Sequence, residues 1–286
     1  MLDDLKHAIK FGNVLTRLII LNVAVFITFN LTGVFLSLGG NGSRFSETVN
    51  GFFAMYSGFG SFLSHPWGII TYQFVHGGIL HLLFNMLWLY WMGRIFIEFL
   101  GSRKLLSVYL IGGMAGAVMF MMAYQTLPLF SDIRNSGSVI GASGSVLAIT
   151  VAAATLVPDY SIGLLFFGQV KLKYLAVAAI ILDLLSMAGP NAGGHIAHLG
   201  GALFGFIYVK QLRSGRNIGS WMDSLILFIE NIFSKKKPGM RVVHRRKVSE
   251  MPDQETIDRI LDKISRSGYE SLTSSEKEIL FKASKK

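Results

Sequence analysis

Apolar runs that approach or exceed 18 residues alternate with shorter polar stretches between residues 14 and 212. A helix needs about 20 mostly apolar residues to cross the hydrocarbon of a bilayer. We therefore expect six membrane-spanning helices, over about residues 14–38, 78–99, 105–124, 141–157, 174–187 and 195–212. The first run is too long for the apolar part of a signal peptide, so we expect it to be retained. The pattern predicts an all-α polytopic membrane protein with a bundle of six transmembrane helices.

The segments between these runs differ in character. Residues 39–78 form a long loop rich in aromatic side chains, which we expect in the membrane interface or packed on the helices. Residues 127–138 are predicted to form a polar turn, and residues 188–194 a turn with glycine and proline. Residues 159–173 are ambiguous between an interfacial strand and an extended entry into the next span.

The chain after the last span predicts a tail with its own structure. Apolar residues at helical spacing, from Trp221 to Phe233, predict an amphipathic helix on the membrane surface, and residues 235–247 a basic linker. Two short helices follow, with Thr273 and Glu276 at the spacing of a capping box. The expected domains are a cytoplasmic N-terminus (1–13), the six-span domain (14–212), the amphipathic helix and linker (213–250) and a small helical cytoplasmic tail (251–286).

The basic residues are concentrated in the C-terminal part of the chain. The net charge is +10, yet 10 of the 27 lysines and arginines lie in residues 1–205 and 17 lie in residues 206–286. A basic tail beside membrane spans predicts orientation or anionic-lipid binding, so we expect lipid and no nucleic acid as a partner. The expected outer loops carry only Arg44 and Arg134, which places both termini in the cytoplasm. There is no cysteine, which excludes disulfides and thiolate chemistry.

Polar side chains inside apolar runs are costly, so each needs a reason. His81 and Asn85 lie four residues apart, on one face of the second expected span, where their N–H groups suit a developing oxyanion. Ser143, between Gly141 and Gly144 at the start of the fourth span, is a candidate nucleophile. Each group taken alone fits helix packing or an interhelical hydrogen bond as well.

The sixth expected span supplies a possible base. His198, Gly201 and Gly205 share one helical face, and the fourth span offers a matching face of small residues that begins at Gly144. If these faces meet, Ser143 and His198 lie one turn above the contact. A histidine within hydrogen-bond reach of a serine is the minimum needed to activate its hydroxyl.

Two further polar residues leave alternatives open. His195 is able to share that face, approach a loop or pair with His198 on a metal, but there is no HExxH and no carboxylate close by in sequence, so we expect no metal. Asp183, in the fifth span, is able to orient a histidine as the third member of a triad. We favour a structural hydrogen bond for Asp183. His65 and His76, in the aromatic loop, are expected to be structural.

Together these residues resemble the rhomboid family of intramembrane serine proteases. The family pattern is HxxxN in the second span, GxSG at the start of the fourth and HxxGxxxG in the sixth. The sequence has His81-Leu-Leu-Phe-Asn85, Gly141-Ala-Ser143-Gly144 and His198-Leu-Gly-Gly201-Ala-Leu-Phe-Gly205 in that order. The resemblance covers about residues 14–210, and the tail looks like one appended to some bacterial rhomboids, so we expect the bacterial cytoplasmic membrane.

The resemblance implies a serine endopeptidase that cleaves transmembrane segments of other proteins and needs no cofactor. It assigns Ser143 as nucleophile and His198 as base, with His81, Asn85 and the Ser143 backbone N–H as the oxyanion hole. Gly144, Gly201 and Gly205 would allow close helix packing. The implied Ser-His dyad leaves Asp183 without a catalytic role, and the fifth span with the 188–194 turn would act as a substrate gate.

Two residues depart from the family pattern. Gly68 replaces the arginine that often follows the loop tryptophan, here Trp67, and Leu147 stands where an aromatic ring commonly stacks on the catalytic histidine. Both departures put the loop anchoring or the activity in question without removing a reacting group. The alternatives are a rhomboid-like protein that binds membrane clients without cleaving them, and a transporter that uses the polar groups as a proton relay. The substrate and the oligomeric state do not follow from the sequence.

Overall fold

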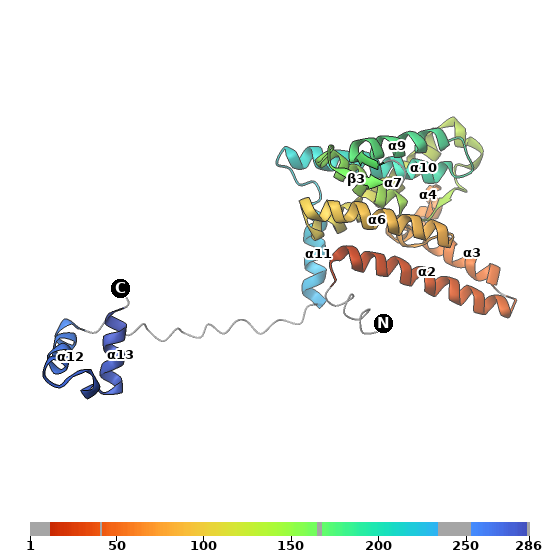
Figure 1. Cartoon of the computed structure of the whole chain (residues 1–286). Coiled ribbons are helices and arrows are strands. Elements are labelled where there is room, and N and C mark those ends of the chain that lie inside the picture. The colour runs from red at the N-terminus through yellow and green to blue at the C-terminus, as the bar shows by residue number, and fades with distance from the viewer. Residues whose placement is uncertain (1–11, 41, 165–167, 234–252, 285–286) are drawn as a thin grey trace. The chain divides into compact units, whose positions relative to one another are not determined.

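The structure is a computed structural model that describes residues 12–40, 42–164, 168–233 and 253–284 of the 286-residue chain. Helices dominate these residues (Figure 1). Six of them correspond to the expected spans: α2 (Val14–Leu38), α6 (Ile79–Leu100), α7 (Ser102–Thr126), α8 (Ser143–Leu156), α9 (Leu172–Ser186) and α10 (Ala192–Arg213). Each begins and ends within three residues of its predicted bounds, because long apolar runs are a strong signal for helices.

The helices differ in length, as the short fourth and fifth expected spans predicted. Four of them, α2, α6, α7 and α10, are long and apolar enough to cross a membrane. The helix α8 has 14 residues and α9 has 15. At about 1.5 Å per residue, α8 rises roughly 21 Å, which is less than the roughly 30 Å of bilayer hydrocarbon.

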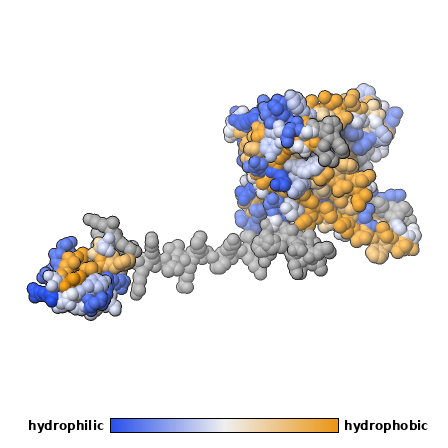
Figure 2. Space-filling view, viewed as in Figure 1, coloured by the Kyte–Doolittle hydropathy of each residue, from blue (hydrophilic) through white to orange (hydrophobic). Residues whose placement is uncertain are grey.

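The helix bundle has a buried centre and exposed edges. Figure 1 shows α9 at one edge and α2 at the other. The helix α8 is buried along most of its length. The outer faces carry large exposed apolar side chains, such as Phe35 (70% exposed) and Leu185 (76% exposed), and Figure 2 shows apolar surface over the visible side of the bundle. Such a surface requires lipid around it, and the protein is a multi-pass membrane protein.

The segment expected as a long loop folds into short elements, so the loop assignment was too simple. It contains α3 (Gly42–Phe53), β1 (Met55–Tyr56), α4 (Phe59–Ser64), α5 (Gly68–Thr71) and the 3-10 helix η1 (Tyr72–Phe74). The strand β1 pairs antiparallel with β2 (Ser138–Val139), with Met55 opposite Val139. This pairing ties the segment to the chain just ahead of α8. A further 3-10 helix, η2 (Pro128–Ile133), lies in the polar turn after α7.

Trp67 and Gly68 anchor this segment by close packing. The Trp67 indole N–H donates to the Phe52 carbonyl at 2.7 Å, and the two rings lie 4.9 Å apart. A Cβ added to Gly68 would lie 2.5 Å from the Ala54 carbonyl oxygen. The glycine therefore has a packing reason, and this backbone leaves no room for an arginine at position 68.

The ambiguous residues between α8 and α9 form a hairpin. The strands β3 (Ser161–Leu164) and β4 (Gly168–Lys171) pair antiparallel, with Ser161 opposite Lys171. Beside it, Asp159 accepts hydrogen bonds from Lys173 at 2.8 Å and Lys171 at 2.9 Å. These two ammonium groups lower the pKa of Asp159 to about 2, with the Lys173 bond as the largest cause.

The chain divides into two compact units, residues 1–230 and 231–286. Most of α11 (Ser220–Phe233) belongs to the first unit, where it meets α7 through a hydrogen bond from Ser107 to Asp223 at 2.5 Å. The second contains α12 (Gln254–Ser267), η3 (Tyr269–Ser271) and α13 (Ser274–Ala283). The predicted capping box of Thr273 and Glu276 is confirmed. The basic linker at 235–247 and most of the expected N-terminal segment lie outside the described residues.

Candidate active site

The turn before α8 places Ser143 at the first residue of the helix. Gly141 has a φ of 127°, a conformation open to glycine, and its N–H donates to the Tyr72 carbonyl at 2.9 Å. A Cβ on Gly141 would lie 2.7 Å from the His81 ring and 3.6 Å from the Ser143 hydroxyl oxygen. The missing side chain therefore lets the His81 imidazole and the serine hydroxyl flank the same turn.

Small residues allow α10 to pack directly against α8. A Cβ on Gly201 would lie 2.0 Å from the Gly144 carbonyl oxygen, and one on Gly205 would lie 2.2 Å from the Ala148 carbonyl oxygen. Backbone meets backbone at both points, as the small-residue spacing in the two segments predicts. The contact brings the helix that carries His198 against the helix that begins at Ser143.

The four polar residues singled out in the sequence line one cavity of 790 Å³. Ser143 comes from α8, His198 from α10, and His81 and Asn85 from α6. Leu147 and Asp183 line the same cavity. Four side chains from three helices converge on one space large enough for a segment of substrate.

Asp183 joins His198, the candidate base, to a second helix. Its Oδ1 lies 2.8 Å from Nδ1 of His198 and 2.7 Å from Nδ1 of His195. Asp183 is 8% exposed, so a partner for its carboxylate is needed. A carboxylate thus lies against both histidines. The expectation of no metal rested on the lack of a carboxylate close by in sequence, and that premise was wrong.

A signal for Asp183 was present in the sequence. The helices α9 and α10 are joined by a short connection near Pro190, so residues at similar distances before and after it lie side by side. Asp183 and His198 stand seven and eight residues from that proline. The hairpin geometry therefore favours a contact between Asp183 and His198, whereas the resemblance implies a Ser-His dyad in which the acid has no catalytic role.

The oxyanion candidates on α6 are held by hydrogen bonds. The Asn85 amide donates one proton to the His81 carbonyl at 2.8 Å, which leaves its second N–H for another acceptor. The Trp88 indole donates to the Thr150 hydroxyl at 2.9 Å and fixes α6 on α8. His76 is buried with its ring 5.2 Å from that of His81, a contact that the sequence did not reveal.

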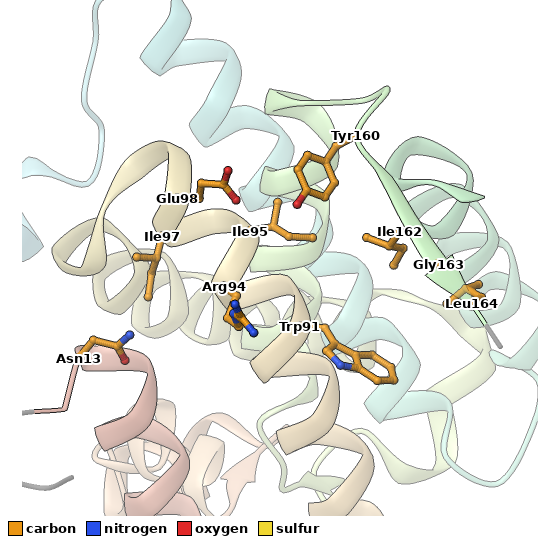
Figure 3. A pocket seen from close by; sticks show the side chains of 10 residues that line it. All are labelled: Asn13, Trp91, Arg94, Ile95, Ile97, Glu98, Tyr160, Ile162, Gly163 and Leu164. Atoms are coloured by element: carbon orange, nitrogen blue, oxygen red, sulfur yellow. The ribbon is translucent and has the colours of Figure 1, made fainter. Parts of the chain in front are cut away.

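Figure 3 shows a second cavity, of 460 Å³, at the other end of α6. Trp91, Arg94 and Glu98 line it from α6, and Tyr160 from the chain before β3. Its described lining contains neither serine nor histidine. Of these two cavities, only the one at Ser143 therefore has both a serine and a histidine in its described lining.

Comparison with known proteins finds rhomboid-like relatives. The protein is similar to RHOMBOID-like protein 12, mitochondrial, of Arabidopsis thaliana, with 31% identity over 52% of this chain and 47% of the relative. It is similar to presenilin-associated rhomboid-like protein A, mitochondrial, of Danio rerio, with 28% identity over 49% of this chain and 36% of the relative. Rhomboid-like protein 14, mitochondrial, of Arabidopsis thaliana is 36% identical over 48% of this chain and 40% of the relative.

The chain thus spans less than half of the length of these curated relatives. Their names place them in mitochondria and give no support to a bacterial membrane. Residues 245–286 match a family of unknown function, DUF6576. Residues 63–214, more than half of the 286, match the rhomboid domain and include all four cavity residues. The chain belongs to the rhomboid family.

Proposed function

We propose that this protein is an intramembrane serine endopeptidase that cleaves transmembrane segments of other membrane proteins. The observation that carries the proposal is the convergence of Ser143, His198, His81 and Asn85 on one cavity within a rhomboid domain. A serine beside a histidine, with amide and imidazole N–H groups across the same space, is the constellation that acyl transfer requires.

In the proposed reaction, the Ser143 oxygen attacks the scissile carbonyl carbon while Nε2 of His198 takes the hydroxyl proton. The oxyanion is held by N–H groups of His81, Asn85 and the Ser143 backbone. The C–N bond then breaks, and His198 returns its proton to the leaving amine. Water attacks the acyl carbonyl carbon while His198 takes a proton from it. The bond between that carbon and the Ser143 oxygen then breaks, and His198 returns the proton to the serine oxygen.

Asp183 extends this scheme from two residues to three. Since Nδ1 of His198 lies 2.8 Å from the Asp183 carboxylate, Nδ1 carries the proton and Nε2 is left as the acceptor. Asp183 is therefore a positioning residue, which holds the imidazole in the tautomer that a base needs. The resemblance alone did not assign it this role.

The short helix α8 explains how water reaches the reaction. A helix of 14 residues that reaches one surface of the bilayer ends about 9 Å short of the other side of the hydrocarbon. In the proposed orientation, with six spans and both termini cytoplasmic, Ser143 lies below the outer surface at the base of the cavity. The helix α9 and the 188–194 turn form the proposed substrate gate. Lipids surround the bundle. The location in a bacterial cytoplasmic membrane stays a prediction.

The experiment that tests the proposal is cleavage of model single-span substrates in liposomes that contain the full chain. The substrates carry small, helix-destabilising residues near one end of the span, and mass spectrometry maps the products. We expect cleavage inside or at the edge of the span by the wild type and none by Ser143→Ala. Intact substrate that stays bound to the wild type would favour the client-binding alternative.

A further inference from the structure

His195 has no part in the proposed reaction, yet it is held as closely as the base. Its Nδ1 lies 2.7 Å from Asp183 Oδ1, and the His198 Nδ1 lies 2.8 Å from the same oxygen. The two rings are 5.6 Å apart and nearly perpendicular. Two imidazoles and one carboxylate thus direct their ligand atoms toward one point, and all three atoms lie within 4.8 Å of one another.

We propose that Asp183, His195 and His198 form a Zn²⁺ site, and that zinc bound there switches the peptidase off. The binding part rests on this cluster alone, and the inhibition rests on the proposed function. Three protein ligands of nitrogen and oxygen, with a fourth position for water, are the usual donor set of an accessible zinc site. Two imidazoles favour zinc over magnesium or calcium, which prefer oxygen ligands.

The geometry needs a small adjustment to admit the ion. Zinc bonds of 2.0–2.2 Å at tetrahedral angles place neighbouring ligand atoms about 3.3 Å apart. The two separations from Asp183 Oδ1 are 2.7 and 2.8 Å, so each must widen by roughly half an ångström. His198 and Asp183 both line the 790 Å³ cavity, which supplies an entry path and the open fourth position.

Zinc at this point acts on the base through its tautomer. The ion takes the Nδ1 lone pair of His198, so the proton of the neutral ring moves to Nε2. Nε2 is then a donor with no lone pair for the Ser143 proton. No bond to the serine is needed for inhibition, and removal of the metal returns the ring to its active form.

The first experiment uses the full chain in detergent, purified with a tag that contains no histidine and freed of metal with a chelator. Bound zinc is measured by elemental analysis after dialysis, and the rate of fluorophosphonate labelling is measured across a zinc titration. We expect one zinc per chain and at least a tenfold fall in labelling rate at saturating zinc, reversed by chelator.

The matched variants are His195→Asn and His65→Asn. His195→Asn removes one ligand and leaves the proposed reacting groups in place, whereas His65 lies in the aromatic cluster with Trp67 and is not among the cavity lining. Each variant is compared with its own metal-free labelling rate. We expect His195→Asn to need about ten times more zinc or more, and His65→Asn to respond as the wild type does.

The outcomes separate the inference from the proposed function. Wild type that labels but retains no zinc and no zinc sensitivity overturns the inference, as does a His195→Asn variant with unchanged zinc affinity. Should His195→Asn fail to fold, the stoichiometry of zinc on the wild type and its zinc-dependent thermal shift decide the binding part. Wild type that binds one zinc but never labels without metal keeps the site and contradicts the peptidase.

Discussion

The helices α8 and α9 both border the candidate active site, but they are held in different ways. Eleven of the 14 residues of α8 are buried, against three of the 15 residues of α9. The helix α8 is locked by backbone contact with α10 at Gly201 and by the Trp88 bond from α6. Ser143, the proposed nucleophile, therefore lies on a fixed support, and Asp183, the proposed positioning residue, lies on an exposed edge helix.

This difference teaches how the site divides its tasks. Attack on a carbonyl requires the serine and the oxyanion donors to stay in place, and α6, α8 and α10 supply that rigidity. In the proposed function a substrate helix enters from the membrane, and the exposed apolar face of α9 is the proposed boundary that moves to admit it. Asp183, whose two bonds join α9 to α10, in the proposed reaction links the position of the edge helix to the orientation of His198.

The largest expected effect comes from disrupting the packing of α10 on α8 at Gly201. Gly201→Val places a side chain where a Cβ alone would lie 2.0 Å from the Gly144 carbonyl oxygen, so α10 must move away from α8. We expect a loss of about 3 kcal/mol or more in stability and no labelling. The control is Gly60→Ala, where a Cβ meets nothing within 4 Å, with thermal unfolding in detergent as the measurement. Equal melting temperatures for Gly201→Val and Gly60→Ala would mean that the close contact at Gly201 is unimportant for stability.

The next effect tests the oxyanion donors of α6. Asn85→Ala removes an amide that lines the cavity, and we expect kcat to fall about 10²–10³-fold with little change in KM. The melting temperature should stay near that of the wild type, since the Trp88 bond to α8 is untouched. Steady-state cleavage of a model substrate gives both constants. A rise in KM alone would assign Asn85 to substrate binding instead.

A smaller effect is expected from the edge helix. Asp183→Asn keeps the size of the side chain but replaces the charged acceptor of His198, so we expect kcat to fall about 10–100-fold. Leu185→Ala, on the exposed face of the same helix, is the matched control and should act as the wild type does. An Asp183→Asn enzyme with the kcat of the wild type would mean that Ser143 and His198 act as a dyad without an orienting acid.

The smallest effect concerns the wall of the cavity at Leu147. This side chain is 7% exposed and lines the cavity with His198. Leu147→Phe adds a ring able to pack on the imidazole, and we expect activity to stay within about threefold of the wild type or to rise. Labelling rates of folded protein check this. A clear loss of activity without misfolding would end the stacking argument.

The sequence predicted the helices well because long apolar runs leave little choice of structure. It also placed Ser143, His198, His81 and Asn85 on three elements whose meeting required helix packing, and the structure brings them into one cavity. The short elements between residues 42 and 74 were missed, since their glycines and mixed polarity resemble a loop.

The hydrogen-bond partners of Asp183 were also not identified from the sequence. A lone acid in an apolar run indicates a polar partner without saying which one. The partner is fixed by the tight connection between α9 and α10, which brings residues 12 and 15 positions apart into contact. Pro190 marks this connection in the sequence, but the apolar pattern of the two runs does not say which side chains of the two helices meet.

The most direct test of the account is fluorophosphonate labelling of the metal-free full chain in detergent. The wild type is compared with Ser143→Ala and His198→Ala, all three matched by thermal unfolding. The account predicts labelling of the wild type and a loss of about 10³-fold or more in both variants. Labelling that survives in Ser143→Ala, or a folded wild type that stays unlabelled beside an active rhomboid peptidase, would contradict it.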